Sequence, residues 1–178
     1  YDKDFEIFVR DFLPTHLTSA IPPFHSEIYK MVEGKQRLVL AAPRGFAKSY
    51  IISKFFPLWL ALFQKKKDIC IISASEGLAC EHLRFIKREL ETNQDIRRFF
   101  GDLKSDKWAE THIVLKNAER VNIRARGAGG QIRGFRPDCI VLDDIETDET
   151  VTSEEQRKKL KDWLFRACLN TLLPSGQL

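Results

Sequence analysis

Residues 37–63 join three features without interruption: an apolar run, a loop that contains glycine, and a second apolar run. The first run, Arg37 to Ala42, has the continuous hydrophobicity of a parallel strand that is buried on both faces. From Lys48 to about Phe63 the pattern predicts a helix that is apolar on nearly all sides and therefore buried. A buried strand that leads through a short loop into a buried helix favours an α/β domain.

The rest of the chain repeats this alternation of strands and helices. Asp68 to Ser73 and Cys139 to Leu142 have the apolar pattern of buried strands, and Glu76 to about Glu91 has that of an amphipathic helix. We therefore expect an α/β fold with a mostly parallel central sheet and helices on both faces. Further expected elements are helices at 4–12 and 24–32, a hairpin of 112–115 with 121–125, a glycine-rich loop at 127–134, and a last helix that starts near Ser153 with Gln156 in a capping box.

Length and composition indicate one domain over residues 1–178, with a short helical lead-in over residues 1–36. The 178 residues are 43% hydrophobic, which suits one compact core. The 4 cysteines show neither a Cys-x-x-Cys pair nor zinc-ligand spacing, so we expect reduced thiols in an intracellular protein. The longest apolar stretch, Phe55 to Phe63, is too short to span a bilayer, and no signal peptide opens the chain. The net charge of +4 does not by itself indicate a nucleic-acid partner.

The loop after the first apolar run has the residue types that phosphate binding requires. A helix N-terminus offers backbone N–H groups, Lys48 offers a cation for the phosphate oxygens, and Ser49 offers a hydroxyl for Mg²⁺. The usual glycine-rich pattern, the Walker A motif, would place glycine where this chain has Ala42 and Ala47. Alanine is tolerable there if the backbone keeps φ negative. The predicted nucleotide-binding residues are Pro43, Arg44, Gly45, Phe46, Ala47, Lys48 and Ser49. An ordinary strand-turn-helix is the alternative.

Acidic residues follow the strand at 139–142, as the Walker B motif of a nucleotide-hydrolysing domain requires. We assign Asp143 to the metal, together with Ser49, and Asp144 to the attacking water, with Glu146 as the competing candidate. Solvated acids at a strand end are the alternative interpretation. The charged stretch from Asp148 onward is interpreted as a solvated surface.

Four segments together resemble the ATPase domain of the large terminase subunit of tailed bacteriophages, in particular its T7-like branch. The resemblance extends from about Phe24 to Pro174. It implies a P-loop NTPase of the ASCE type and makes alanine before the P-loop lysine an ordinary variant. The segments are Arg44 to Tyr50, Ile71 to Ser75, Gly130 to Gly134, and Val141 to Glu146.

The resemblance also implies roles for arginines. Arg44 would contact the phosphates and act as an arginine finger in cis, and a surface arginine at a turn is the alternative. The catalytic residues would then be Arg44, Asp144 and Glu146. Arg126, Arg133 and Arg136 would sense the γ-phosphate, act on a neighbouring subunit or contact DNA, and a solvated basic loop is the alternative. A glutamine that reads adenine in many relatives is absent near Phe24 and His25.

As a whole, the resemblance implies an enzyme that hydrolyses ATP with Mg²⁺ to move double-stranded DNA into a procapsid. The implied partners are DNA, the portal protein, the small terminase subunit and further copies in a ring, in the cytoplasm of an infected bacterial host. The family's C-terminal nuclease domain is not expected in this chain, and nor is nuclease activity. The alternatives are a helicase-like P-loop ATPase and a nucleotide-dependent DNA-binding module without hydrolysis.

Overall fold

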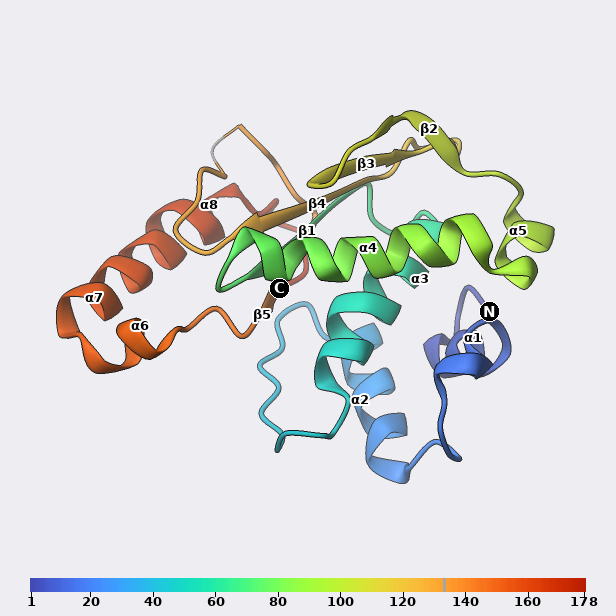
Figure 1. Ribbon diagram of the computed structural model, residues 1–178, viewed down its shortest axis with the longest axis horizontal. Helices are drawn as coiled ribbons and strands as arrows, with labels where there is room; N and C mark the ends of the chain where they lie inside the picture. Colours follow the sequence, from blue (N-terminus) through green and yellow to red (C-terminus); the bar gives the residue numbers. More distant parts are fainter. Residues whose placement is uncertain (133) are drawn as a thin grey trace.

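The computed structural model describes residues 1–132 and 134–178, which form a sheet of order β2-β3-β4-β1-β5 with helices around it (Figure 1). The central strand β1 pairs in parallel with both β4 and β5, whereas β3 is antiparallel to both β2 and β4. The strands are β1 (Asp68–Ser73), β2 (Lys104–Trp108), β3 (His112–Leu115), β4 (Asn122–Gly127) and β5 (Cys139–Asp143). The sheet is therefore mixed, and the prediction of a mostly parallel sheet is wrong. Only antiparallel pairing is possible between β3 and β4, because a short turn joins them.

Alternate residues of β1 enter two different cores, so both faces of the sheet are covered. Ile69 and Ile71 belong to a large core with α1 to α4, and Cys70 and Ile72 belong to a smaller core with Cys168. The prediction of helices on both faces is thus confirmed. The helices are α1 (Phe5–Phe12), α2 (Pro23–Gly34), α3 (Phe56–Leu62), α4 (Glu76–Thr92), α5 (Gln94–Phe100), α6 (Asp148–Thr152), α7 (Glu154–Trp163) and α8 (Leu169–Thr171), with the single turns or π-helical segments η1 (Pro14–His16), η2 (Tyr50–Phe55) and η3 (Leu164–Cys168).

The segment Arg37 to Ala42 is not a strand, contrary to the prediction. The segment is hydrogen-bonded to the C-terminal residues only near its start, where Leu38 N donates to Leu178 O at 2.9 Å. Beyond that point a cavity of about 320 Å³ separates it from β5, and Val39 is 96% exposed. An apolar run becomes a strand only where a neighbouring strand continues the ladder of hydrogen bonds, and none of the described residues does so here.

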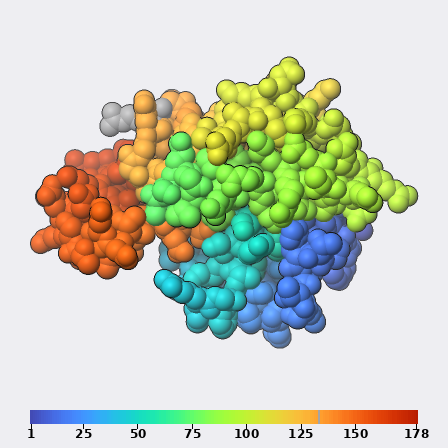
Figure 2. All heavy atoms as spheres, viewed as in Figure 1, coloured from blue at the N-terminus to red at the C-terminus, as the bar shows by residue number. Residues whose placement is uncertain are grey.

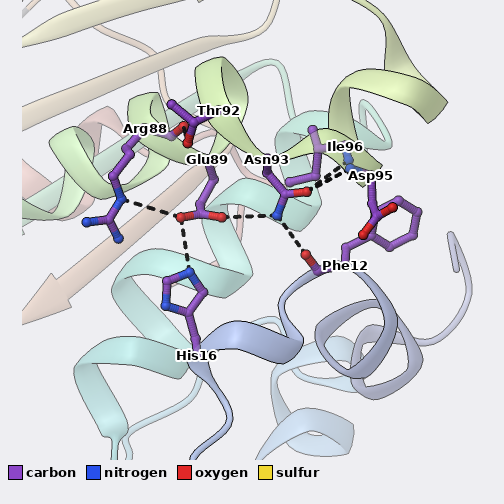
Figure 3. A network of polar contacts seen from close by, with 8 residues as sticks. All are labelled: Phe12, His16, Arg88, Glu89, Thr92, Asn93, Asp95 and Ile96. Atoms are coloured by element: carbon purple, nitrogen blue, oxygen red, sulfur yellow. Dashed lines mark hydrogen bonds and ion pairs between the residues drawn. The ribbon is translucent and has the colours of Figure 1, made fainter.

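The N-terminal helices are fixed to α4 by a buried polar network (Figure 3). Glu89, which is 5% exposed, lies 3.0 Å from His16 Nε2 and accepts from Asn93 Nδ2 at 3.1 Å. Asn93 Nδ2 also donates to the carbonyl oxygen of Phe12 at 2.8 Å. The network satisfies polar groups that would otherwise be buried without partners, and so it joins the lead-in to the body of the domain.

After β5 the chain forms a lobe of α6 and α7, the orange region that projects at the left of Figure 2. Ser153 caps α7, because its side chain accepts from Gln156 N at 3.4 Å. The predicted start of the helix is thus confirmed, but the capping box is not complete, since Ser153 N donates to Glu149 O instead of to the Gln156 side chain. Trp163 Nε1 donates to Gly130 O at 2.9 Å, so the end of α7 is attached to the glycine-rich loop.

All four cysteines are free and buried, in agreement with the predicted thiols. Within residues 1–132 and 134–178, the helices are too short or too polar to cross a membrane.

Candidate functional site

The predicted phosphate loop lies where the irregular segment 37–42 turns into a helix. Helical backbone begins at Lys48 and continues through η2 and α3, so Lys48 and Ser49 stand in the first helical turn. The side chain of Lys48 turns back to donate to the carbonyl oxygen of Ala42. This contact keeps the ammonium group at the mouth of the loop, where a phosphate could replace the carbonyl oxygen.

The loop backbone is left-handed at two positions. Gly45 has φ 83° and Ala47 has φ 54°. The expectation that φ would be negative at Ala47 is therefore wrong. The chain needs a sharp reversal to bring the helix N-terminus against the loop, and at Ala47 it makes that reversal without glycine.

Aromatic residues hold the loop from the outside. His25 Nε2 lies 3.1 Å from the carbonyl oxygen of Phe46, so the ring nitrogen donates this hydrogen bond. The rings of Phe24 and Phe46 have centroids 4.9 Å apart. Phe24 and His25, near the position where the resemblance implies an adenine-reading glutamine, thus contact the loop itself.

Asp143, at the end of β5, is the residue that connects the loop to the sheet. Its Oδ1 accepts from Ser49 Oγ at 3.1 Å, and its Oδ2 lies 3.0 Å from His82 Nε2 on α4. The side chains of Asp143 and His82 are each 13% exposed. The structure therefore brings together the two residues that were assigned to the metal, Ser49 and Asp143.

The surroundings of Asp143 keep it ionised. Burial raises the pKa of Asp143, but hydrogen bonds from His82 and Ser49 offset this effect and leave the pKa below its usual value. The hydroxyl of Ser53 also lowers the pKa of Asp143. It forms no hydrogen bond with any of the described residues. A carboxylate that stays charged at neutral pH is what a metal ligand must be.

These residues fit Mg²⁺. Magnesium keeps several waters and is usually held by one or two carboxylates plus phosphate oxygens, so a site made of protein ligands alone is not required. In the described part of the chain no group of three or more His, Cys, Asp or Glu side chains could hold a metal alone. Asp143 and the hydroxyl of Ser49 are the residues that would hold Mg²⁺ beside a bound nucleotide.

The other two candidate carboxylates face a cavity of about 670 Å³ next to the loop. Asp144 and Glu146 both line it, together with Arg44 and Lys48. Asp144 has φ 46°, a left-handed conformation that aspartate adopts more readily than most residues. Its position beside Asp143 is fixed by a bond from Ala74 N to the carbonyl oxygen of Asp144 at 3.1 Å. Either carboxylate can therefore reach a ligand in this cavity.

The remaining predicted arginines lie elsewhere or outside the described residues. Arg126, on β4, lies over the ring of Phe135 at 5.1 Å and 3.9 Å from Glu76, and neither it nor Arg136 lines the cavity. Arg136 is exposed, and Arg133 falls outside the residues that the structure describes. The roles of these three arginines stay predictions.

The structure adds three residues that the sequence analysis did not select. Arg157 and Lys161, one turn apart on α7, line the same cavity as Arg44 and Lys48. His82 contacts Asp143 from α4. A signal for His82 exists in the sequence, because it interrupts the buried helical stripe that contains Ala79 and Ile86.

Comparison with known proteins finds similarity to the large subunits of bacteriophage terminases. No protein-family model matches the chain. The large terminase subunit of Enterobacteria phage T3 is 28% identical over 145 residues, which cover 77% of this chain and 24% of that relative. The crystal structure of the HK97 bacteriophage large terminase has a TM-score of 0.63 at 13% identity, and the match covers 97% of this chain and 43% of that chain.

The two comparisons carry different weight. At 13% identity the match to the solved structure shows a shared fold and nothing more. The match to the phage T3 protein adds sequence similarity along most of the chain, which itself spans about a quarter of that relative's length. Sequence and fold agree, and together they confirm that this chain is similar to the large subunits of bacteriophage terminases.

Proposed function

We propose that this chain is the ATPase region of a viral DNA-packaging motor, an ASCE-type P-loop domain that hydrolyses ATP with Mg²⁺. The hydrogen bond between Ser49 and Asp143 is the observation that carries the proposal. It joins the hydroxyl after the loop lysine to the carboxylate at the end of a parallel strand, the pair that holds Mg²⁺ in P-loop domains.

Each side chain of the site would have its own role in hydrolysis. Lys48 and Arg44 would bind the phosphate oxygens and stabilise the charge on the transferring phosphoryl group. Asp143 and Ser49 would hold Mg²⁺, which neutralises charge on the β- and γ-phosphates when it is bound. Asp144 or Glu146 would orient the attacking water, since both line the cavity beside the loop.

The full-length protein would use this hydrolysis to translocate double-stranded DNA into a procapsid. Its similarity to large terminase subunits supports DNA, the portal protein, the small terminase subunit and a ring of identical subunits as partners. The setting would be the cytoplasm of an infected bacterial cell. Lysine and arginine contacts to DNA phosphates would make the grip independent of sequence and weaker at high salt.

Phosphate release by the full-length protein tests the proposal, with Lys48→Ala and Asp143→Ala as variants. We expect each variant to lose at least about tenfold of the rate, because each removes a charge that acts on the phosphates or the metal. Separate Asp144→Asn and Glu146→Gln variants then identify the carboxylate that orients water.

Rates that are equal in the wild type and in Lys48→Ala would contradict hydrolysis at this loop. Nucleotide binding without any phosphate release would favour a binding module instead. Unwinding of a forked duplex would favour a helicase.

A further inference from the structure

We propose that His82 is a positioning residue for Asp143, and this inference rests on the proposed function of the site. His82 Nε2 lies 3.0 Å from Asp143 Oδ2, and Ser49 Oγ lies 3.1 Å from Oδ1 of the same carboxylate. The carboxylate is thus held at both oxygens, from α4 on one side and from the phosphate loop on the other. With both oxygens bonded, its plane cannot rotate freely.

The chemistry of the contact determines which ring nitrogen carries hydrogen. An aspartate carboxylate oxygen accepts hydrogen bonds, and His82 Nε2 lies within hydrogen-bonding distance of Asp143 Oδ2. His82 must therefore donate from Nε2. Its other nitrogen, Nδ1, is buried and has no partner among the described residues, so no competing bond turns the ring away from Asp143.

The fold places His82 on a rigid support. It lies within α4, between Ala79 and Leu83, which are both fully buried against the sheet. On the other side, Ile72 and Ser73 of β1 pair with Leu142 and Asp143 of β5, so the strand end cannot shift independently of β1. The donor and the acceptor are thus both anchored to β1, His82 through the packing of α4 and Asp143 through the pairing of β5.

This arrangement leaves Oδ1, on the Ser49 side, as the oxygen that turns toward the metal. Hydrogen bonds from outside the coordination sphere orient metal ligands, and their loss typically costs about 10- to 100-fold in metal affinity or activity. His82 would act on Mg²⁺ only through Asp143 and would not touch the nucleotide.

Two substitutions separate the donated hydrogen bond from the bulk of the ring. His82→Leu fills the site without a donor, and His82→Gln restores an N–H group at similar reach. In the full-length protein we expect His82→Leu to weaken Mg²⁺-dependent ADP binding about 10- to 100-fold by calorimetry. ADP binding in EDTA should stay unchanged, and His82→Gln should recover most of the loss. Equal Mg²⁺ dependence in wild type and His82→Leu, with the fold intact by circular dichroism, would overturn the inference.

A second measurement does not depend on nucleotide. Nitrogen-15 NMR of the imidazole should show hydrogen on Nε2 in the free protein, and Asp143→Ala should disturb this signal. Hydrogen on Nδ1 alone would overturn the proposed contact. If the wild type and Lys48→Ala both failed to bind ADP while the NMR signal behaved as expected, the proposed function would fail and the contact would stand.

Discussion

Ala47 occupies a backbone conformation that costs free energy for any residue with a Cβ atom. Its φ of 54° lies in the left-handed region, where an L-residue other than glycine pays about 1–2 kcal/mol. The loop keeps this conformation because Ile51 N donates to Ala47 O at 3.0 Å and starts the helix behind it. Strain of this kind is common at ligand-binding turns.

Ala47→Gly should therefore leave the free energy of unfolding unchanged or raise it by up to about 1 kcal/mol, because relief of the strain exceeds the added chain entropy. Ala42→Gly is the matched control, since Ala42 does not have positive φ and should only lose about 0.5–1 kcal/mol. Urea unfolding measures both. Equal destabilisation by the two substitutions would show that Ala47 is not left-handed.

The ionisation of Tyr29 makes the stability of the folded chain depend on pH in the alkaline range. Burial raises the pKa of Tyr29 to about 12, and its ring lies 5.0 Å from that of Phe5. The folded chain holds the phenol proton more tightly than the unfolded chain does. The resulting stability is complete below about pH 10, the usual pKa, and is lost as pH rises toward 12.

Between pH 10 and 12 the wild type should lose up to about 2 kcal/mol more free energy of unfolding than Tyr29→Phe, which has no proton to release. Chemical unfolding at several pH values in this window gives the difference. Parallel curves for the two proteins would mean that Tyr29 ionises as easily in the folded chain as in the unfolded one.

Helix α4 contacts both the N-terminal lead-in and the candidate site. Near its C-terminal end, Glu89 binds His16 and Asn93, and nearer its start His82 binds Asp143. The buried network at Glu89 should contribute far more to stability than ion pairs on the surface of the same helix, because its polar groups have no water to replace a lost partner.

Glu89→Ala should lower the free energy of unfolding by about 2 kcal/mol, since it leaves buried donors without an acceptor. Glu91→Ala, two residues away, removes only an exposed ion pair with Lys104 and should cost less than about 1 kcal/mol. Thermal or urea unfolding of both variants checks this. Similar losses would indicate that Glu89 is hydrated rather than buried.

The sequence predicts an element well where the local hydrophobic pattern and the tertiary packing favour the same structure. Asp68–Ser73 contains a continuous apolar run, Glu76–Thr92 has an amphipathic helical pattern, and both pack as expected. The run Arg37 to Ala42 has an equally strong pattern, yet it lacks a paired strand among the described residues, because pairing depends on the tertiary structure rather than on the run itself. The edge strand Lys104–Trp108 was missed because it is mostly polar.

The candidate site was predictable where a motif marks it and not where the fold alone creates it. Lys48, Ser49 and Asp143 come from short patterns, and the structure brings Ser49 and Asp143 into contact. No motif identifies His82 or Arg157: the position of His82 in the buried stripe of its helix marks it only as unusual, and the fold is needed to place both residues at the site.

In the molecule as a whole, the lobe of α6 and α7 projects from the rest of the structure (Figure 2), and helix α7 of this lobe lines the cavity beside the loop. Arg157 and Lys161 of the lobe line it opposite Arg44 and Lys48. Four cations around one cavity suit a polyphosphate, since each can form a charge-assisted hydrogen bond to a phosphate oxygen.

Replacing both Arg157 and Lys161 by alanine should weaken ATP binding about tenfold, which corresponds to about 1.4 kcal/mol. The control replaces Lys158 and Lys159, which lie on the same helix, do not line the cavity and change the net charge equally. Calorimetric titration of each double variant with nucleotide measures the effect. Equal weakening by both would show that overall charge, rather than contact in the cavity, attracts the nucleotide.

We propose that the loop at 42–49 and Asp143 form one Mg²⁺-nucleotide site. An experimental structure with Mg²⁺ and a non-hydrolysable ATP analogue tests it most directly. We predict that Lys48 Nζ leaves the carbonyl oxygen of Ala42 for the β- and γ-phosphates, with Ser49 and Asp143 on the side of the metal. A nucleotide bound elsewhere, with Lys48 and Asp143 far from its phosphates, would rule out this site.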